Sequence, residues 1–412
     1  MSPSQTTKSL SILTIPVVVG ALGYFVDIFD LVLFSVVRTP SLRDLGVPPE
    51  QLLSTGVVLL NLQMTGMLLG GFLWGVLGDR RGRRSVLFGS ILLYSVANLA
   101  NAFVTDVTWY GVLRFVAGLG LAGELGAAIT LVAETLPKDK RGYGTGLVAG
   151  IGLSGAVASG LVVEMFSWRV AYGLGGVLGL GLLAMRFGMR ESGLFENVAS
   201  RKDVRRGDLR MLFGDRKRLA RFAACVGIAV PVWFVVGILV TFSPELAAAM
   251  GATGPVLAGR AILWCYAGIA IGDVLSGFWS QWRGSRKKVV RDMLIAVTIL
   301  VAVFPFLRGV SPFAFYFLFF LLGLATGYWA VFMTLSAENF GTNLRATVTT
   351  AVPNLVRGSV VLLTLAFDAG RSALGPVSSA LTVGTVALAI AFFSLANLDE
   401  THAKDLSYEE VG

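Results

Sequence analysis

The stretch Gly75-Val-Leu-Gly-Asp79-Arg-Arg-Gly82-Arg-Arg84 is a short basic loop with long apolar segments on both sides. A second basic loop, Gln281-Trp-Arg-Gly284-Ser-Arg-Lys-Lys288, returns half a chain later, so that Gly284 lies 202 residues after Gly82. A chain of 412 residues that repeats a loop at this distance is predicted to fold as two similar halves.

A second pair of signatures follows nearly the same offset. Glu134 and Arg141 are separated by the same spacing as Glu338 and Arg345, and Arg345 lies 204 residues after Arg141. In a membrane protein, two parallel repeats are typical of a transporter that rocks around a site at the repeat interface. Transport is therefore the leading hypothesis before any substrate is considered.

The composition is that of a protein that crosses the membrane many times. The chain is 55% hydrophobic and 14% charged, with a mean hydropathy of +0.75, whereas soluble domains carry about 25% charged residues. About twelve apolar stretches are long enough to cross the hydrocarbon core as helices. The spans that we predict are residues 11–36, 53–77, 84–104, 108–133, 144–166, 169–189, 222–242, 257–281, 289–307, 311–334, 346–369 and 377–396.

The formal net charge of +9 comes largely from the loops. Basic residues gather in alternate loops and in the middle of the chain, which is the positive-inside bias. This bias predicts a multi-pass protein with both termini in the cytoplasm, and the short external loops suit a protein of the bacterial inner membrane. The charge is therefore attributed to topology and to contact with the lipid bilayer, not to a nucleic-acid partner. The polar segment 1–9 and the long first span do not have the pattern of a cleavable signal peptide.

The chain is predicted to divide into four parts. Residues 1–189 form an N-terminal six-helix bundle, 190–221 a charged cytoplasmic linker, 222–398 a C-terminal six-helix bundle, and 399–412 a cytoplasmic tail. The whole sequence contains two Cys and one His. These are too few for a soft-metal site or a disulfide framework, so no metal and no cofactor is expected.

The loop at 75–84 resembles, nearly position for position, the signature after the second span of the major facilitator superfamily. Arg114-Phe-Val-Ala-Gly118-Leu-Gly120-Leu-Ala-Gly123-Glu124 resembles the fourth-span region of its sugar porters, organic ion transporters and metabolite–proton symporters. Asp27-Ile-Phe-Asp30 is similar to the Asp-Gly-Phe-Asp element of aromatic-acid and sialic-acid proton symporters, with Ile28 in place of Gly. The resemblance implies an all-α integral membrane fold of twelve helices in two pseudo-symmetric halves, alternating access, and a monomer.

Two departures from the family pattern bear on the substrate and on the loops. Gln281 stands where the second half would repeat Asp79, which weakens the loop contact on that side. The seventh span, around Pro231-Val-Trp-Phe234, lacks the paired Gln of sugar porters. A sugar is therefore not the expected substrate.

Charged side chains inside the predicted spans are candidates for function, because lipid is a costly place for a charge. Asp27 and Asp30 share one face of the first span, and their repulsion favours a proton on at least one of them. In the symporters that this chain resembles, a first-span Asp pairs with a fourth-span Arg, which by motif position gives Asp30 and Arg114. This pair either couples transport to protons or is a permanent ion pair. Glu124 is a second proton site or a counter-charge for Arg357.

Arg357 is the strongest candidate for a contact with substrate. It lies near the middle of the predicted span 346–369, at the depth where transporter sites occur, and its guanidinium fits a carboxylate bidentately. The alternative is a salt bridge to Glu124. Other polar or hydroxyl-bearing side chains in the spans are predicted to contact substrate, namely Tyr328, Tyr266, Asn354, Asn61 and Gln63. Asp273, in the eighth span, has no assigned role.

A last set of charged residues lies at the cytoplasmic ends of the spans. We expect these side chains to form gating salt bridges that stabilise one access state. The gating candidates are Asp79, Arg83, Glu134, Arg141, Glu338 and Arg345.

Together these features predict a secondary active transporter that moves a small organic anion, a carboxylate, by proton symport. One alternative is a proton-coupled antiporter that exports organic cations, and the required charge of the ligand discriminates the two. Another is a non-transporting membrane sensor whose middle loop binds a soluble partner. The sequence has no nucleophile–His arrangement and no phosphate-binding loop, so an enzyme is not expected.

Overall fold

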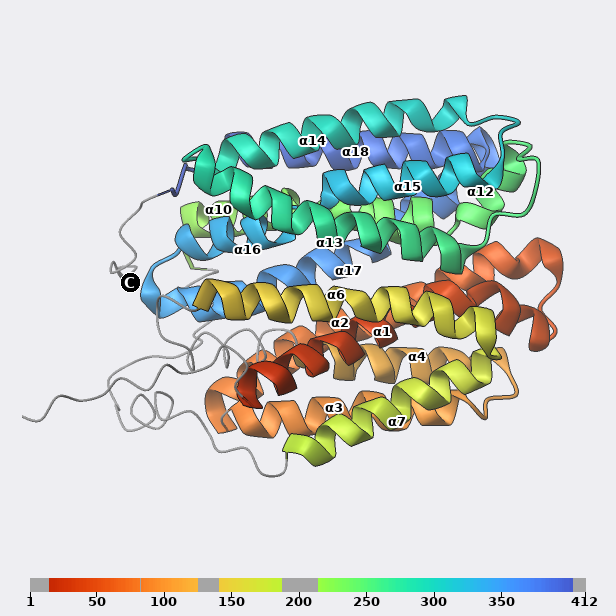
Figure 1. Cartoon of the computed structure of the whole chain (residues 1–412), viewed down its shortest axis with the longest axis horizontal. Coiled ribbons are helices and arrows are strands. Elements are labelled where there is room, and N and C mark those ends of the chain that lie inside the picture. The colour runs from red at the N-terminus through yellow and green to blue at the C-terminus, as the bar shows by residue number, and fades with distance from the viewer. Residues whose placement is uncertain (1–14, 82, 125–140, 187–213, 403–412) are drawn as a thin grey trace, which may run out of the picture.

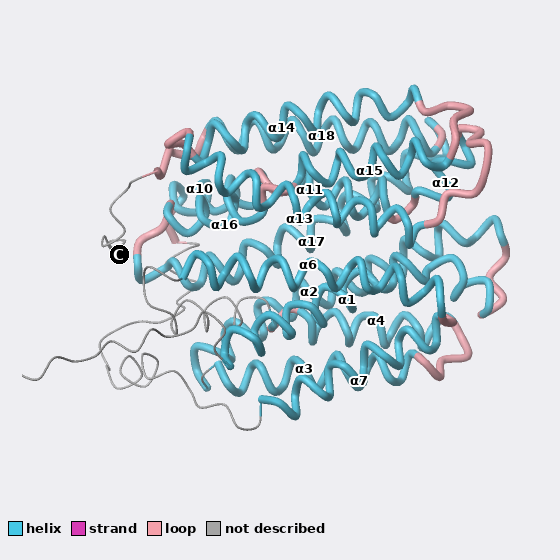
Figure 2. The backbone as a smooth tube through the Cα atoms, in the orientation of Figure 1, coloured by secondary structure: helices cyan, strands magenta, loops and turns pink. Residues whose placement is uncertain are grey.

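The computed structural model describes residues 15–81, 83–124, 141–186 and 214–402, and all regular structure in these ranges is helical (Figures 1 and 2). The α-helices are α1 (Ile15–Asp44), α2 (Leu52–Arg81), α3 (Arg83–Asn101), α4 (Val107–Leu121), α6 (Arg141–Met165), α7 (Trp168–Arg186), α10 (Arg216–Gly227), α11 (Val230–Phe234), α12 (Ser243–Ala249), α13 (Ala258–Trp282), α14 (Arg286–Val303), α15 (Pro312–Thr326), α16 (Trp329–Glu338), α17 (Thr342–Leu374) and α18 (Pro376–Ala396). Short 3-10 helices span Pro49–Gln51 and Phe304–Phe306, and a π-helix spans Val235–Val240.

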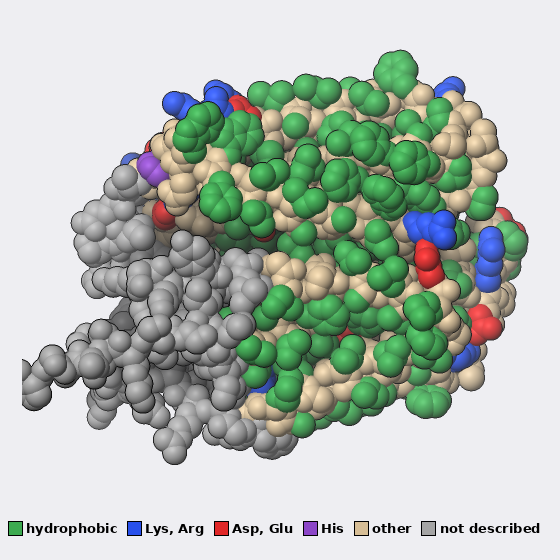
Figure 3. All heavy atoms as spheres, viewed as in Figure 1, with side chains coloured by type: hydrophobic (Ala, Val, Ile, Leu, Met, Phe, Trp, Pro, Cys, Tyr) green, Lys and Arg blue, Asp and Glu red, His purple; other side chains and the backbone are tan. Residues whose placement is uncertain are grey.

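The helices have the length and composition of membrane spans. Within the described residues, nine helices or helix pairs are long and apolar enough to cross a bilayer, and three shorter apolar helices accompany them. The visible face is covered by apolar side chains, and most of its charged side chains lie toward the two ends (Figure 3). The predicted all-α integral membrane fold is confirmed, and the helices are consistent with the predicted twelve.

The helices form two groups that lie side by side. α1 to α7 form the lower group in Figure 1, and α10 to α18 form the upper group. They meet where α2 packs on α17 and where α6 packs on α13. Gly160 of α6 faces Gly259 of α13 so closely that a Cβ atom on Gly160 would lie 3.0 Å from the Gly259 carbonyl oxygen. Small residues therefore allow the two groups to touch.

We call the end of the bundle where α1 ends and α2 begins the distal end, and the opposite end the proximal end (right and left in Figure 1). The first helix is longer than predicted, because it continues from the predicted limit at residue 36 to Asp44. The seventh span also begins earlier than predicted, because α10 starts at Arg216. The Asp215 carboxylate caps α10 by accepting hydrogen bonds from the backbone amides of Lys217 and Arg218, which lower the pKa of Asp215. Most of the predicted linker and tail lies outside the described residues, so the four-part division stays a prediction.

Two spans that were predicted as unbroken helices, 222–242 and 311–334, are interrupted, which corrects the prediction. The first is split between α10 and α11 just before Pro231, which has no amide hydrogen to donate. The second is split at Gly327, between α15 and α16. Backbone groups freed by such breaks need partners in a membrane, and side chains supply them. The Tyr328 hydroxyl donates to the Ile228 carbonyl oxygen at 2.9 Å, and the Asp273 carboxylate accepts from the Ala330 amide at 2.8 Å.

Candidate functional site

α1 and α17 bring Asp27 and Arg357 together where the two helix groups meet. The Arg357 Nη2 atom lies 3.7 Å from the Asp27 Oδ2 atom, and both side chains are almost completely buried. Each residue lies near the middle of its helix, as predicted for Arg357. Among the described residues, neither Asp27 oxygen has a hydrogen-bond partner, and neither have Arg357 Nε and Nη1. The pair is thus electrostatically matched but leaves hydrogen-bonding capacity unused.

Glu124 has a different partner from the one predicted as an alternative. Arg186, the last residue of α7, donates from Nη1 to Glu124 Oε2 at 3.1 Å and from Nη2 to Glu124 Oε1 at 2.5 Å. Both side chains are buried, so the predicted salt bridge between Glu124 and Arg357 is wrong. Sequence reasoning missed Arg186 because it lies at the edge of a predicted span, just before the basic middle loop. α1 passes the pair at Gly23, where a Cβ atom would lie 2.6 Å from Glu124 Oε1.

Asp30 and Arg114 are both fully buried, but they do not form the predicted ion pair in this structure. Arg114 Nη2 instead donates to Asn98 Oδ1 at 2.5 Å, and the guanidinium lies over the Tyr172 ring at 4.4 Å from its centre. Neither oxygen of Asp30 accepts a hydrogen bond of good geometry from a described residue, and the Asn98 side chain is the polar group that lies close to this carboxylate. A proton-coupling role for these two residues stays a prediction.

Four of the predicted substrate contacts make hydrogen bonds between helices. Gln63 Nε2 donates to the Leu31 carbonyl oxygen at 3.2 Å, Asn354 Nδ2 donates to the Ala122 carbonyl oxygen at 3.2 Å, and Asn61 Oδ1 accepts from Thr364 Oγ1 at 2.5 Å. The Tyr328 hydroxyl is used at the helix break described above. These bonds give each side chain a structural use, and a contact with substrate stays a prediction for each of them.

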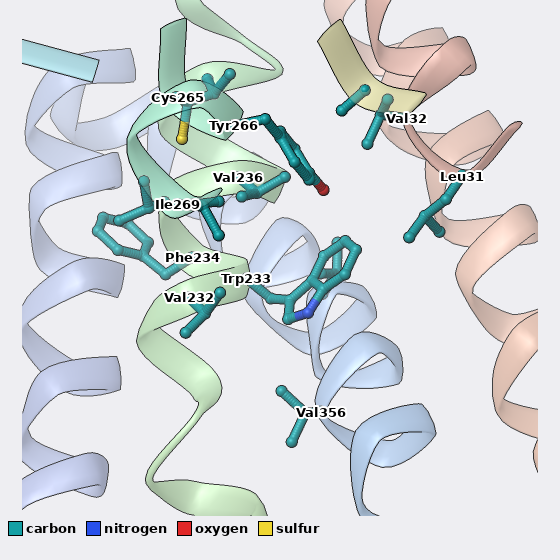
Figure 4. Packing of buried hydrophobic residues seen from close by; sticks show 14 of the residues in the cluster. Leu31, Val32, Val232, Trp233, Phe234, Val236, Cys265, Tyr266, Ile269 and Val356 are labelled. Atoms are coloured by element: carbon teal, nitrogen blue, oxygen red, sulfur yellow. The ribbon is translucent and has the colours of Figure 1, made fainter. Parts of the chain in front are cut away.

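Tyr266 is placed differently from the other polar candidates. Its ring projects from α13 toward α1, where Leu31 and Val32 lie opposite, and Trp233 of α11 lies nearby (Figure 4). Val356 of α17, the neighbour of Arg357 in sequence, lies on the helix beside Trp233 (Figure 4). Tyr266 and Trp233 of the C-terminal group are therefore directed toward the N-terminal group, whereas Phe234 points away from it (Figure 4).

The gating candidates can be compared with the structure only at Glu338. Its carboxylate lies 3.6 Å from Arg286 Nη2 and accepts a hydrogen bond from Thr401 Oγ1 at 2.6 Å, so it bridges elements of the C-terminal group. The remaining five candidates have side chains outside the described residues, namely Asp79, Arg83, Glu134, Arg141 and Arg345. Their gating role stays a prediction.

A salt bridge between the two groups lies at the distal end and was not predicted. The buried Arg38 of α1 lies 2.7 Å from Glu245 of α12, and Arg38 Nη2 also donates to the Thr241 carbonyl oxygen at 3.2 Å. Next to it, Thr241 Oγ1 lies 3.0 Å from Ser35 Oγ. This contact was not expected from the sequence, because the first span was predicted to end at residue 36, before Arg38. Among the described residues, no group of three or more His, Cys, Asp or Glu side chains is placed to hold a metal ion.

Comparison with curated proteins gives relatives that are named as transporters of small organic acids. The niacin transporter NiaP of Acinetobacter baylyi is 36% identical over 164 residues, which are 39% of this chain and 36% of that protein. The putative niacin/nicotinamide transporter NiaP of Bacillus subtilis is 32% identical over 45% of this chain and 46% of that protein. The chain therefore matches less than half of the length of these two relatives. The gentisate transporter of Corynebacterium glutamicum is 26% identical over 97% of this chain and 93% of that protein.

Solved structures share the fold at low sequence identity. A D-xylose–proton symporter superposes with a TM-score of 0.70 at 17% identity, over 95% of this chain and 99% of that chain. A bacterial homologue of the lysosomal transporter Spinster superposes with a TM-score of 0.67 at 14% identity, over 95% and 98% of the two chains. The sequence model described as Major Facilitator Superfamily matches residues 20–365. The chain belongs to the Major Facilitator Superfamily.

Proposed function

We propose that this protein is a secondary active transporter that moves a small aromatic carboxylate across the bacterial inner membrane together with protons. The observation that carries the proposal is Arg357, a guanidinium buried between the two helix groups with Nε and Nη1 free of hydrogen bonds to described residues. A buried cation with unused donors is suited to a bidentate carboxylate ligand. The names of the relatives, for niacin and gentisate, support an aromatic acid as the ligand.

Asp27 gives this site a means of coupling to protons. When Asp27 is ionised, it neutralises Arg357 across 3.7 Å. A substrate carboxylate that entered then would leave one excess negative charge in a buried place, which is unfavourable. When Asp27 is protonated, it no longer neutralises Arg357, and the substrate carboxylate can take the place of the Asp27 carboxylate beside Arg357. The proton and the anion therefore bind together, which is the condition for symport. In this mechanism the Asp27 carboxylate competes with the substrate carboxylate for Arg357. Asp30 and Arg114 form a second charged cluster, which takes no part in this competition.

Alternating access follows from the arrangement of the two groups around this pair. We place both termini and the proximal end in the cytoplasm, in accord with the positive-inside bias. The contacts of Arg38 with Glu245 and Thr241 then close the outer side. Rocking of the groups breaks these contacts and opens the path to Arg357 from outside. The export of organic cations has less support, because Asp27 already faces Arg357 and Glu124 is neutralised by Arg186.

The test measures lumenal pH in proteoliposomes that contain the purified protein. Niacin, gentisate or 4-hydroxybenzoate is added outside, and nicotinamide serves as the control because it replaces the carboxylate of niacin with a neutral amide. We expect acidification with at least one acid beyond that of protein-free liposomes, none with nicotinamide, and loss of the protein-dependent part in Arg357→Ala. Lumenal alkalinisation on addition of an organic cation, with no response to the acids, would instead establish cation antiport.

A further inference from the structure

We propose that a chain of buried hydroxyl groups, formed by Ser41, Tyr110 and Tyr172, carries protons between the distal surface and the cluster of Asp30 and Arg114. This route lies inside the N-terminal group, whereas the proposed substrate site lies between the groups. The inference rests on the proposed function, because it gives the proton of that symport its own path.

The three hydroxyl groups form a continuous hydrogen-bonded chain. The Tyr110 and Tyr172 hydroxyl oxygens lie 2.8 Å apart, and the Tyr110 hydroxyl oxygen lies 3.2 Å from Ser41 Oγ. The side chains come from three different helices, α4, α7 and α1, and each is fully buried. Three hydroxyl groups that meet in this way can pass a proton along, because each can donate and accept at the same time.

The inner end of the chain lies at the charged cluster. Arg114 follows Tyr110 by one turn of α4, and its guanidinium covers the Tyr172 ring at 4.4 Å. Gly175 follows Tyr172 by about one turn of α7, and a Cβ atom at Gly175 would collide with the Asp30 carboxylate. α7 therefore leads from Tyr172 to Asp30 within one turn, and α4 leads from Tyr110 to Arg114 within one turn.

The outer end of the chain lies one helical turn from the surface. Ser41 precedes Asp44 by three residues on α1, and the Asp44 side chain is 51% exposed. Asp44 Oδ2 accepts from Trp168 Nε1 at 3.2 Å and lies 3.1 Å from Arg169 Nη2. The Trp168 ring in turn packs against Tyr110. Ser41 is itself buried, and its hydroxyl also donates to the Arg38 carbonyl oxygen at 3.1 Å. The outer end of the hydroxyl chain is therefore separated from water by one turn of α1.

Buried polar groups of α3 and α4 keep unused hydrogen-bonding capacity beside Asp30 and Asn98. Among the described residues, Arg114 Nε and Nη1, Ser95 Oγ and both polar atoms of the Asn101 side chain have no hydrogen-bond partner. All of these side chains are fully buried. Buried polar groups are normally satisfied by protein or by water, so we infer that this cluster is hydrated. Such water links the Tyr172 hydroxyl to Asp30.

One transfer leaves every hydroxyl group neutral. Asp30 gains a proton from Tyr172 through water, Tyr172 regains one from Tyr110, and Tyr110 regains one from Ser41. For the last step the Ser41 hydroxyl turns from the Arg38 carbonyl oxygen to Tyr110, and Ser41 regains its proton from water that enters beside Asp44. The net change is one proton moved from bulk water to Asp30. The titratable or charged groups that face Asp30 are Asp27 on its own helix, Arg114 on α4, Tyr94 on α3 and Tyr172 on α7.

The experiment compares Tyr110→Phe and Tyr172→Phe with Tyr316→Phe in proteoliposomes. The Tyr316 hydroxyl accepts a hydrogen bond from the Leu257 amide at 2.9 Å and lies in the C-terminal group, so its loss removes a comparable bond away from the route. The probe is whichever of niacin, gentisate and 4-hydroxybenzoate acidifies wild-type vesicles. Two rates are measured, uptake driven by a pH gradient and exchange of labelled probe at equal pH, which moves no net proton.

We expect both route variants to slow gradient-driven uptake by about tenfold or more, the scale of a lost proton-transfer group, and to keep exchange near the wild-type rate. Tyr316→Phe keeps both rates. The inference is overturned if the route variants keep gradient-driven uptake, or if uptake and exchange fall together, which indicates a structural role. Failure of the proposed function is seen separately, because wild-type vesicles would then exchange a probe without acidification or respond to none.

Discussion

The two halves of this molecule have similar basic loops in sequence, but they differ in how many charged side chains they bury and in how those side chains are hydrogen-bonded. Among the described residues, the N-terminal group buries six charged side chains, namely Asp27, Asp30, Arg38, Arg114, Glu124 and Arg186, and the C-terminal group buries two, Asp273 and Arg357. Asp273, the acid of the C-terminal group, accepts a hydrogen bond from the Ala330 amide at a helix break. The two acids on α1, by contrast, have no hydrogen-bond partner in the described part of the chain.

The two groups of helices therefore differ in the chemistry of their buried charge, although the sequence repeats a basic loop in both halves. A buried acid that caps a helix stabilises the fold. A buried acid without hydrogen-bond donors is stabilised in its neutral form, and can exchange a proton when its surroundings change. The N-terminal group is therefore the better candidate for handling protons, and the C-terminal group contributes Arg357 and two interrupted helices. The predictions below test this division.

The largest expected effect contrasts Asp27→Asn with Asp273→Asn. Asn at position 27 cannot ionise, so it cannot compete with a substrate carboxylate for Arg357, and we expect pH-driven accumulation to be lost while exchange continues. Asn at position 273 keeps an oxygen that accepts the Ala330 amide, so both activities remain. The measurement is accumulation of labelled substrate in proteoliposomes with and without a pH gradient. Equal loss in the two variants would show that the halves do not differ in this respect.

Asp30→Asn provides a second test of the division, because it removes a charge that has no ion-pair partner within 4.0 Å among the described residues. We expect it to uncouple accumulation from the pH gradient and to spare exchange. The same two transport assays measure it. Unaltered uphill uptake would remove Asp30 from the coupling mechanism and leave Asp27 as its carboxylate.

The next effect concerns stability within the N-terminal group. Glu124→Gln leaves Arg186 buried without its counter-charge, and breaking a buried ion pair costs about 3–5 kcal/mol. Thermal unfolding in detergent can be followed with a thiol-reactive dye, because both cysteines of the chain, Cys225 and Cys265, are buried. We expect a clear fall in unfolding temperature for Glu124→Gln and none for Asp30→Asn. A similar fall in both would mean that Asp30 is held by interactions as strong as those of Glu124.

A smaller effect is expected where the two groups meet at the distal end. Glu245→Gln leaves the buried Arg38 with weaker partners, which we expect to lower the unfolding free energy by about 1–3 kcal/mol. Glu164→Gln is the matched control, because Glu164 pairs with Arg260 across the same interface but both side chains are exposed. Exposed pairs contribute at most about 1 kcal/mol. The dye assay compares them, and a larger loss in Glu164→Gln would contradict the importance of burial.

The sequence predicted the membrane fold and the placement of Arg357 well, because repeats and span lengths depend on local pattern. It failed for partners, because a partner depends on how helices rotate against each other. A salt bridge to Glu124 was the alternative predicted for Arg357, yet the structure places Asp27 beside Arg357 and pairs Glu124 with Arg186. Helix ends were the other weakness. Arg38 lay beyond the predicted first span, because a predicted span stops where hydropathy falls even when the helix continues. Arg186 lay inside a predicted span, but so near its end, just before the basic middle loop, that it was not a candidate.

The smallest effect lies at the proximal surface of the C-terminal group. The Glu400 carboxylate accepts hydrogen bonds from the Ser285 hydroxyl and from the backbone amides of Arg286 and Lys287, so it caps the start of α14. Partial burial alone would raise the pKa of Glu400, but hydrogen bonds from Ser285 and from nearby backbone amides outweigh it and lower the pKa. A lowered pKa in the folded state means that the stabilisation is present above the ordinary pKa of Glu and is lost as the pH falls through the lowered value.

We therefore expect Glu400→Gln to lower the unfolding free energy by about 0.5–2 kcal/mol at neutral pH, the usual contribution of a cap. The difference from the wild type should shrink as the pH falls from the ordinary pKa of Glu, about 4.3, through the lowered pKa of Glu400, because the wild-type carboxyl becomes neutral over that range. Thermal unfolding with the thiol-reactive dye is unsuited to low pH, so tryptophan fluorescence is the measurement. A difference that stays constant with pH would show that the side chain acts through its shape and not through its charge, and would separate this surface acid from the buried acids of α1.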